Sequence, residues 1–305
     1  MRLGWSVHYK RIKILFLLFN ILFSQDTFSI VAVDTLSREV GSAGASCIAG
    51  SIIISDVHPG LGAIHTQSYW NPSNQNNASQ LFQQGFSPQY IIDWLISNDV
   101  QNNSSIRQYG IVDLIDGGRS AAFTGNNCFD YKNHIVGPNY SIQGNILLNQ
   151  AILDSMEYRF NNTSGSLATR LMAALQGANV PGADSRCLDD SISSLSAFIR
   201  VAKENDNIDS LYLDLNVNDI TYIIDPIDSL QNLYDLWYVQ NPDYILGDIN
   251  SDYHIDILDI IMCMNIILGY YEPDNIQVQA ADYDQNLTIN ILDVIQIANQ
   301  VLANL

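Results

Sequence analysis

Positive charge is scarce in this sequence, which has 13 lysine and arginine residues against 32 aspartate and glutamate residues. Four of the 13 lie within the first 13 residues, so the remaining chain carries nine basic against 32 acidic residues, a net charge of −23. Such a chain repels phosphate backbones and anionic lipid surfaces, which argues against nucleic acid and anionic membranes as partners. The same charge suits a protein that holds cations.

Cysteine is also rare, with only Cys47, Cys128, Cys187 and Cys263. None of them forms a CxxC pair, so a cysteine-based metal site is not expected. Cys263 lies in an apolar helical run, where we expect a buried thiol. The other three allow at most one disulfide in an exported protein, and its pairing cannot be read from the sequence.

Long hydrophobic runs are absent except for Ile14–Phe23, which follows a basic segment. This nearly unbroken apolar run of ten residues is too short to cross a bilayer, so residues 1–25 are predicted to be a signal peptide, cleaved after Ser24 or Gln25. No later stretch is long and uncharged enough to span a membrane. We therefore expect an extracellular protein, secreted freely or tethered to a cell surface.

About 280 residues remain after the leader, which favours two domains over one. Residues 26–240 contain both the alternating apolar pattern of strands and the three-to-four-residue apolar spacing of helices. Strands come at both ends with helical pairs between them, which predicts a layered α+β domain rather than βαβ units. A short linker follows at 241–246, and residues 247–305 form a second unit. The expected strands are 27–33, 61–67, 109–115, 120–125, 140–148, 194–202 and 210–217, and the expected helices are 77–85, 87–98, 149–160, 164–178 and 226–238.

The second unit is an internal repeat, in which "DINSDYHIDILDIIMCMNIIL" from Asp248 returns as "DYDQNLTINILDVIQIANQVL" from Asp282. The copies start 34 residues apart and align without gaps. Repetition at a fixed spacing indicates a duplicated structural unit.

Each copy carries oxygen-bearing side chains at positions 1, 3, 5, 9 and 12 of a loop, 248–259 in the first and 282–293 in the second. Short acidic and amide side chains at alternating positions point inward and suit calcium, and position 7 adds a backbone carbonyl. Position 6, usually glycine, is Tyr253 or Leu287 here, so a strained turn and weaker affinity are expected. Two Ca²⁺ sites are predicted, with ligands Asp248, Asn250, Asp252, His254, Asp256 and Asp259 in one and Asp282, Asp284, Asn286, Thr288, Asn290 and Asp293 in the other.

Two such loops, each ending in Asp and leading into one apolar helix, resemble the type I dockerin module. This resemblance implies an all-α, EF-hand-like unit that folds on calcium and binds a cohesin on a scaffold or cell surface. The alternative is that the pair only caps or stabilises the first domain.

Thr27 stands at the start of the first predicted strand, a few residues past the predicted cleavage sites. A threonine at a free amino terminus can attack a carbonyl with its own α-amine as the base. Cleavage after Ser24 or Gln25 leaves Thr27 internal, so this chemistry requires further trimming or self-cleavage.

The first domain resembles the domain-of-unknown-function family 1028 from Thr27 to about Asp235. The motifs that carry the resemblance are TFSIVAVD, REVGSAGAS, GLGAIHTQSYWNP, YGIVDLIDGGRSAAFTGNNC, YSIQGNIL, GADSRC and SSLSAFIRV. That family is similar to the N-terminal-nucleophile hydrolases, which implies a four-layer αββα sandwich and cleavage of an amide in a peptide, a cell-wall fragment or an acylated small molecule.

The resemblance implies roles for several residues. Thr27 would be the nucleophile, Asn145 an oxyanion donor, and Asp184 with Arg186 would orient the amine or bind a carboxylate. Gln67 and Asn71 would position the substrate.

Structural readings stand beside these roles. Thr27 could simply start a strand, Asn145 satisfy a turn, and Asp184 pair with Arg186, while His65 is expected to be a hydrogen-bonded sheet residue. The alternative functions are a non-catalytic exported binding module, or a part in polysaccharide degradation suggested by the dockerin. The latter is weaker because no glycosidase carboxylate pair is evident.

Overall fold

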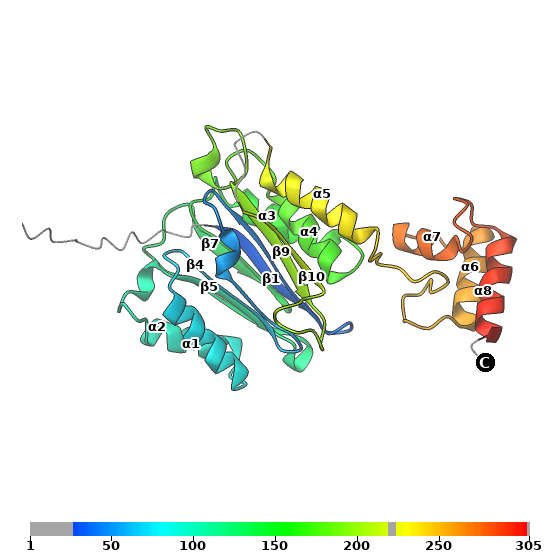
Figure 1. Ribbon diagram of the computed structural model, residues 1–305, viewed down its shortest axis with the longest axis horizontal. Coiled ribbons are helices and arrows are strands. Elements are labelled where there is room, and N and C mark those ends of the chain that lie inside the picture. Colours follow the sequence, from blue (N-terminus) through cyan, green and yellow to red (C-terminus); the bar gives the residue numbers. More distant parts are fainter. Residues whose placement is uncertain (1–26, 219–223, 304–305) are drawn as a thin grey trace, which may run out of the picture.

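The computed structural model describes residues 27–218 and 224–303, so the predicted leader lies outside the described residues. The first domain is a mixed α+β structure with two antiparallel sheets (Figure 1). The six-stranded sheet has the order β10 (Leu213–Val217), β9 (Ser196–Ala202), β2 (Glu39–Ser46), β1 (Phe28–Asp34), β8 (Tyr140–Gly144) and β7 (Asn133–Val136). The four-stranded sheet has the order β3 (Ser55–His58), β4 (Gly62–Gln67), β5 (Gln108–Asp113) and β6 (Arg119–Thr124).

Helices cover the outer face of each sheet (Figure 1). On the four-stranded sheet, α1 (Pro72–Gln83) and α2 (Pro88–Ser97) bury Phe82, Ile91 and Leu95 against β4 and β5. The six-stranded sheet is covered by α3 (Ala151–Asn162), α4 (Leu167–Gly177) and α5 (Pro226–Tyr238). Short 3₁₀ turns complete the domain at η1 (Ser51–Ile54), η2 (Ser104–Ile106), η3 (Ile115–Gly117) and η4 (Ser185–Cys187).

Local signals explain where the helices begin and end. Ser87 and Ser166 cap α2 and α4 by accepting hydrogen bonds from backbone N–H groups that the first helical turn leaves unpaired. At the other end of α4, a side chain at Gly177 would lie 2.6 Å from the Ser155 carbonyl of α3, so glycine permits the two helices to touch. The predicted end of this helix near Gly177 is confirmed.

The space between the two sheets changes character along its length. At one end it is apolar, filled by a cluster that includes Val31, Val33, Val57 and Val112. Towards the beginning of β1, the inward-facing side chains become serine, glutamine, asparagine and histidine, all buried. Buried polar groups are stable only when they bond to one another, so this half of the interface must form a connected network.

The C-terminal unit contains α6 (Ile257–Ile267), α7 (Asn275–Ala281) and α8 (Ile291–Ala303). Its own small core includes Ile249, Cys263, Val294 and Ile297. The sequence predicted a helix after each loop, but not α7, which Asp274 caps at its start. In the described ranges, none of the helices has the length and apolar character needed to cross a bilayer.

Candidate active site and calcium loops

Thr27 is fully buried at the head of β1, between the ends of β2 and β8. The registers Phe28–Ala45 and Phe28–Gly144 place it opposite Ser46 on one side and Asn145 on the other. Side chains directly opposite one another share a sheet face, and so do Thr27 and Ser29, which are two residues apart on one strand. Because the Ser29 hydroxyl bonds to Gln67 of the other sheet, this face points between the sheets. The Asn145 backbone N–H donates to the Thr27 carbonyl at 3.1 Å.

Gln67, at the end of β4, reaches across from the other sheet to Thr27. Its Nε2 donates to the Thr27 carbonyl at 3.2 Å and to Oε1 of Gln108 at 2.8 Å, while its Oε1 accepts from the Ser29 hydroxyl at 2.6 Å. Both amide hydrogens are therefore used within the protein, and the residue is 1% exposed. The structure brings Gln67 to Thr27, but in a geometry that holds Thr27 rather than one that faces a substrate.

Gln108, which the sequence analysis did not single out, connects the two side chains beside Thr27. Its Oε1 also accepts from Nδ2 of Asn145 at 3.0 Å. Its Nε2 lies against the carbonyls of Asn133 and Gly144, at 3.1 and 3.0 Å. One Nδ2 hydrogen of Asn145 is thus committed, and the predicted oxyanion role would need the other.

Backbone strain gathers next to these amides. Ser68 and Tyr69 both have φ of 52°, directly after Gln67, and Ile146 has φ of 55°, directly after Asn145. Left-handed backbone is costly for residues with a side chain, and such strain tends to occur at functional sites. No sequence rule points to it, because none of these residues is one that favours the left-handed region.

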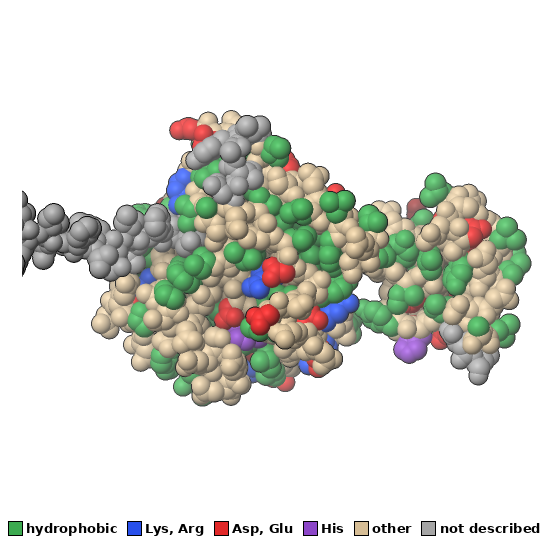
Figure 2. Space-filling view, viewed as in Figure 1, with side chains coloured by type: hydrophobic (Ala, Val, Ile, Leu, Met, Phe, Trp, Pro, Cys, Tyr) green, Lys and Arg blue, Asp and Glu red, His purple; other side chains and the backbone are tan. Residues whose placement is uncertain are grey.

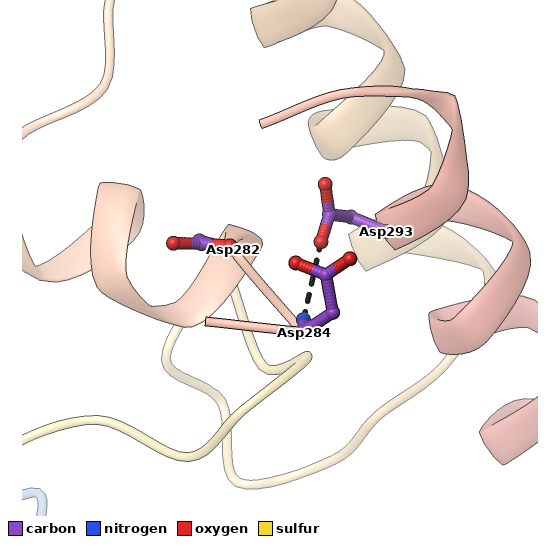
Figure 3. A group of neighbouring side chains, drawn as sticks. All are labelled: Asp282, Asp284 and Asp293. Atoms are coloured by element: carbon purple, nitrogen blue, oxygen red, sulfur yellow. Dashed lines mark hydrogen bonds between the residues drawn. The ribbon is translucent and has the colours of Figure 1, made fainter. Parts of the chain in front are cut away.

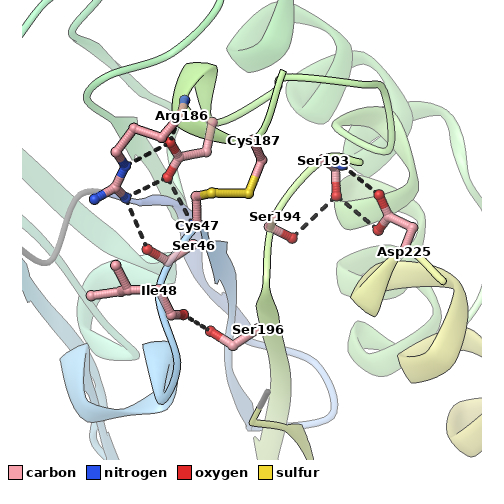
Figure 4. Close-up of a disulfide and its surroundings, with 10 residues drawn as sticks. Ser46, Cys47, Ile48, Arg186, Cys187, Ser193, Ser194, Ser196 and Asp225 are labelled. Atoms are coloured by element: carbon pink, nitrogen blue, oxygen red, sulfur yellow. Dashed lines mark hydrogen bonds and ion pairs between the residues drawn. A yellow bond between two sulfur atoms is a disulfide. The ribbon is translucent and has the colours of Figure 1, made fainter. Parts of the chain in front are cut away.

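Arg186 lies beside the same end of β2, next to Ser46 (Figure 4), and it pairs there with Asp184. The fully buried Asp184 carboxylate accepts two hydrogen bonds from the Arg186 guanidinium, at 2.9 and 2.6 Å, and one from the Cys47 backbone N–H at 2.9 Å. Arg186 also lies 3.4 Å from the Ser46 hydroxyl, the β2 neighbour of Thr27. The pair is thus a bidentate ion pair one strand away from Thr27.

A disulfide joins Cys47 to Cys187 at this point (Figure 4), in line with the expectation of at most one bridge in the first domain. Cys128 is buried, with its thiol donating to the Arg107 carbonyl at 3.3 Å. Cys263 is a buried thiol in the C-terminal unit, as predicted.

Asn71 is not brought together with Thr27 by any contact in the described part of the chain. Its side-chain oxygen accepts from the backbone N–H groups of Ser73 and Asn74 and caps α1, with Pro72 at the first helical position. An asparagine directly before a proline is a strong signal for this local role.

His65 is a fully buried sheet residue, as expected from its alternation with apolar neighbours. Its Nε2 lies 2.6 Å from the Ser42 hydroxyl and its Nδ1 lies 2.9 Å from the Ser29 hydroxyl. Burial, with a smaller effect of the Arg200 charge, lowers the pKa of His65 to about 3. The imidazole is therefore neutral at physiological pH and serves as a link in the polar network.

The two acidic loops have the same hydrogen-bond pattern. The first aspartate of each loop accepts from the backbone N–H groups at positions 5 and 6, in Asp248 as in Asp282. The last aspartate, Asp259 or Asp293, accepts from those at positions 3 and 9. The match across the repeat shows that both copies fold the loop in one way.

Three carboxylates converge in the second loop (Figure 3). Asp282, Asp284 and Asp293 each place an oxygen within 4.8 Å of the others, which is close enough to share a cation. The first loop has Asn250 at the position of Asp284, so an amide oxygen replaces one carboxylate there. Such oxygen sets fit calcium, which accepts carboxylate, amide and carbonyl ligands.

The non-glycine residues at position 6 adopt the left-handed backbone that the sequence analysis anticipated. Tyr253 has φ of 66° and Leu287 has φ of 68°. Both side chains point outward, since they are 69% and 94% exposed. The turn is therefore kept without glycine, at the cost of local strain.

Apolar side chains also remain exposed on the two loop-following helices (Figure 2). Corresponding residues of the repeat behave alike, as Ile257 and Ile291 are 58% and 59% exposed, and Leu258 and Leu292 are 54% and 53% exposed. Repeated exposed apolar residues on a small unit indicate a surface for a partner.

The comparisons agree with this division of the chain. Residues 27–230 match the model of a family of unknown function, DUF1028, and residues 246–302 match the type I dockerin domain. The chain therefore belongs to the DUF1028 family and carries a type I dockerin domain after it. Among curated proteins, none matches this chain.

The chain also aligns with solved structures, of which one from the same family shows a similar fold. The crystal structure of protein SPO2555 from Silicibacter pomeroyi, of the same family, aligns with a TM-score of 0.58 and 22% identity over 70% of this chain and 89% of that one. Anbu, the ancestral beta-subunit from Yersinia bercovieri, aligns with a TM-score of 0.39 and 12% identity over 70% of this chain and 96% of that one. An Anbu mutant from Hyphomicrobium sp. strain MC1 aligns with a TM-score of 0.40 and 11% identity over the same shares.

Proposed function

We propose that this protein is an exported amide-bond hydrolase in which Thr27 becomes the amino-terminal residue and acts as the nucleophile. The observation that carries the proposal is the position of Thr27, buried at the head of β1 with its carbonyl held from both sheets by Asn145 and Gln67. A residue that merely begins a strand needs only the backbone hydrogen bond from Asn145, not the second bond from the Gln67 side chain. The family match also begins at this residue.

The reaction follows from the two groups on one residue. Thr27 Oγ1 adds to the carbonyl carbon of the substrate amide while its proton passes to the Thr27 α-amine. The C–N bond then breaks, and the leaving amine takes that proton. Water attacks the resulting threonyl ester, which releases the acid and restores the hydroxyl.

Neighbouring groups hold this residue in place. Gln67 and Gln108 fix the carbonyl side, and the Asp184–Arg186 pair supports Ser46 on the β2 side. Because Arg186 retains a side-chain exposure of 30%, it is the charged group at this end that a substrate carboxylate could approach.

The dockerin domain supplies attachment. Type I dockerin domains bind calcium, and we propose two Ca²⁺ ions, one in each loop, held in an EF-hand-like manner by the twelve predicted ligand residues. The matched exposed residues of α6 and α8 would then dock a cohesin on an extracellular scaffold or cell surface. This arrangement would keep the hydrolase near other secreted proteins on the same scaffold.

Two measurements on the secreted protein test the catalytic proposal. Intact-mass analysis should show a chain that begins at Thr27, and incubation with a β-lactone probe should add one acyl group to that chain. Thr27→Ser should retain the adduct, and Thr27→Val, which has nearly the same shape, should abolish it. A stable chain that begins before Thr27 and still forms the adduct would disprove the mechanism.

A further inference from the structure

One buried acceptor beside Thr27 has no partner. Oδ1 of Asn145 makes no hydrogen bond within the described part of the protein, although the residue is fully buried. An unpaired buried polar atom costs about 1–3 kcal/mol, so its persistence calls for a function. It belongs to the side chain directly opposite Thr27 on the same sheet face.

The orientation of this amide is fixed by the network behind it. Nε2 of Gln108 lies against the backbone carbonyls of Asn133 and Gly144, which can only accept hydrogen bonds. Its Oε1 must therefore face Gln67 and Asn145, and both must donate to it. Asn145 consequently presents Nδ2 to Gln108 and is left with Oδ1 for the opposite side.

The carbonyl of Thr27 cannot be the partner of this acceptor. The Thr27 carbonyl already receives the Asn145 backbone N–H and Nε2 of Gln67, and it has no hydrogen to give. The remaining candidate donors are the Thr27 hydroxyl, the α-amine of Thr27 once that residue is the amino terminus, and a bound substrate. Because the proposed reaction passes the hydroxyl proton to the amine, the amine is the donor that the protein itself would supply. Directly opposite residues have Cβ atoms about 5 Å apart, within reach of a hydrogen bond from the amine nitrogen.

We infer that Asn145 is a positioning residue whose Oδ1 accepts a hydrogen bond from the α-amine of Thr27, with Gln108 setting its orientation. This inference rests on the proposed function, because it requires the free amine. A neutral acceptor orients the amine and leaves its lone pair available to take the hydroxyl proton. A carboxylate at the same place would instead hold the amine as ammonium and suppress its action as a base.

Charged and titratable groups packed around Thr27 must be considered in any test of the amine. In the described residues these include Asp184 with Arg186 beyond β2, His65 on β4, which contacts Ser29, Arg200, whose charge acts on His65, and His134 on β7. Asp184 and Arg186 neutralise each other, and burial lowers the pKa of both histidines. The amine is therefore expected to respond chiefly to residue 145.

The test uses the full chain beginning at Thr27, with the dockerin retained. Trace acetylation with acetic anhydride across a pH series, read on the peptide that ends at Arg38, gives the pKa of the α-amine. Asn145→Asp should raise this pKa by about one unit or more, as expected for a carboxylate within 4–6 Å. Asn149→Asp is the matched control, because that exposed residue lies four positions away and its side-chain oxygen accepts, within the described residues, only from the Ala151 backbone N–H at the start of α3, which a carboxylate can also do.

A second variant guards against misfolding. Asn145→Ser keeps a hydroxyl acceptor and should leave the pKa near the wild-type value, with β-lactone acylation slowed by less than for Asn145→Leu. If Asn145→Asp folds and leaves the pKa where Asn149→Asp leaves it, the inference is wrong. If the secreted protein never begins at Thr27, the proposed function fails instead. The intact mass therefore tests the proposed function, and the pKa of the α-amine tests the inference about Asn145.

Discussion

Removing the disulfide should destabilise the first domain strongly. The bridge between Cys47 and Cys187 closes a loop across 140 residues, and in the chain-entropy model a loop of this length restricts the unfolded chain by about 5 kcal/mol at 25 °C. That value is an upper bound, because measured losses for native disulfides are about 2–5 kcal/mol. We expect a Cys47→Ala, Cys187→Ala double variant to lose about 3 kcal/mol or more of unfolding free energy.

Tryptophan fluorescence isolates the domain in this assay. Trp70, Trp94 and Trp237 all precede the C-terminal unit, so guanidinium unfolding followed by fluorescence reports on the first domain alone. Cys263→Ala is the control, because its thiol packs in the other core and should not change the fluorescence midpoint. A double variant within about 0.5 kcal/mol of wild type would refute the reasoning, as would four titratable thiols in the denatured, unreduced protein.

Three further outcomes are expected. His65→Asn should reduce the acid sensitivity of folding, measured by denaturation across a pH series. The pKa of His65 is about 3 in the folded protein and 6.5 in the unfolded chain, so between these values the unfolded state binds more protons. The free energy of unfolding therefore falls by up to about 1.4 kcal/mol per pH unit as the pH drops through that window, and the variant should lose this dependence. Gly110→Ala would place a methyl 2.0 Å from Oε1 of Gln143, and a loss of about 1–3 kcal/mol in chemical denaturation is expected, whereas an unchanged midpoint would contradict the packing. Chelation with EDTA should lower the helical circular dichroism of the C-terminal unit. Asp259→Ala and Asp293→Ala should each reduce the calcium bound per chain from two ions to one, as measured by equilibrium dialysis. Two bound ions in both variants would exclude these loops as the sites.

Local signals in the sequence were sufficient for several elements. The helix predicted at 226–238 matches α5 residue for residue, because Asp225 and Pro226 mark its start. Helix α1 begins five residues before the predicted helix, since its first turn is polar and only the cap at Asn71 with Pro72 reveals it.

Strand β2 was missed for a tertiary reason. Its run of glycine, serine and alanine has low strand propensity, yet it lies in the middle of the six-stranded sheet. A side chain at Gly41 would lie 2.3 Å from Leu171 of α4, and one at Gly44 would lie 2.9 Å from Phe198 of β9. Small residues are needed there for close packing, which only the folded structure reveals.

The sequence named several residues that lie together in the candidate site, but it did not predict how they are connected. Thr27, Gln67 and Asn145 were all singled out, and the structure brings them together. Their connection through Gln108 could not be foreseen, because it depends on the register between strands that lie far apart in the chain.

The amide and hydroxyl layer between the sheets also determines how this protein can change. Ser29, His65, Gln67 and Gln143 each bond to two or three other side chains of this layer. Replacing one of them alone therefore leaves several buried polar groups without a partner. Substitutions in this layer are therefore expected to occur together, whereas the valine-lined half can accept single substitutions. Because the bonds within the layer join uncharged groups, added salt should leave this half of the sandwich almost unaffected, even in so acidic a protein.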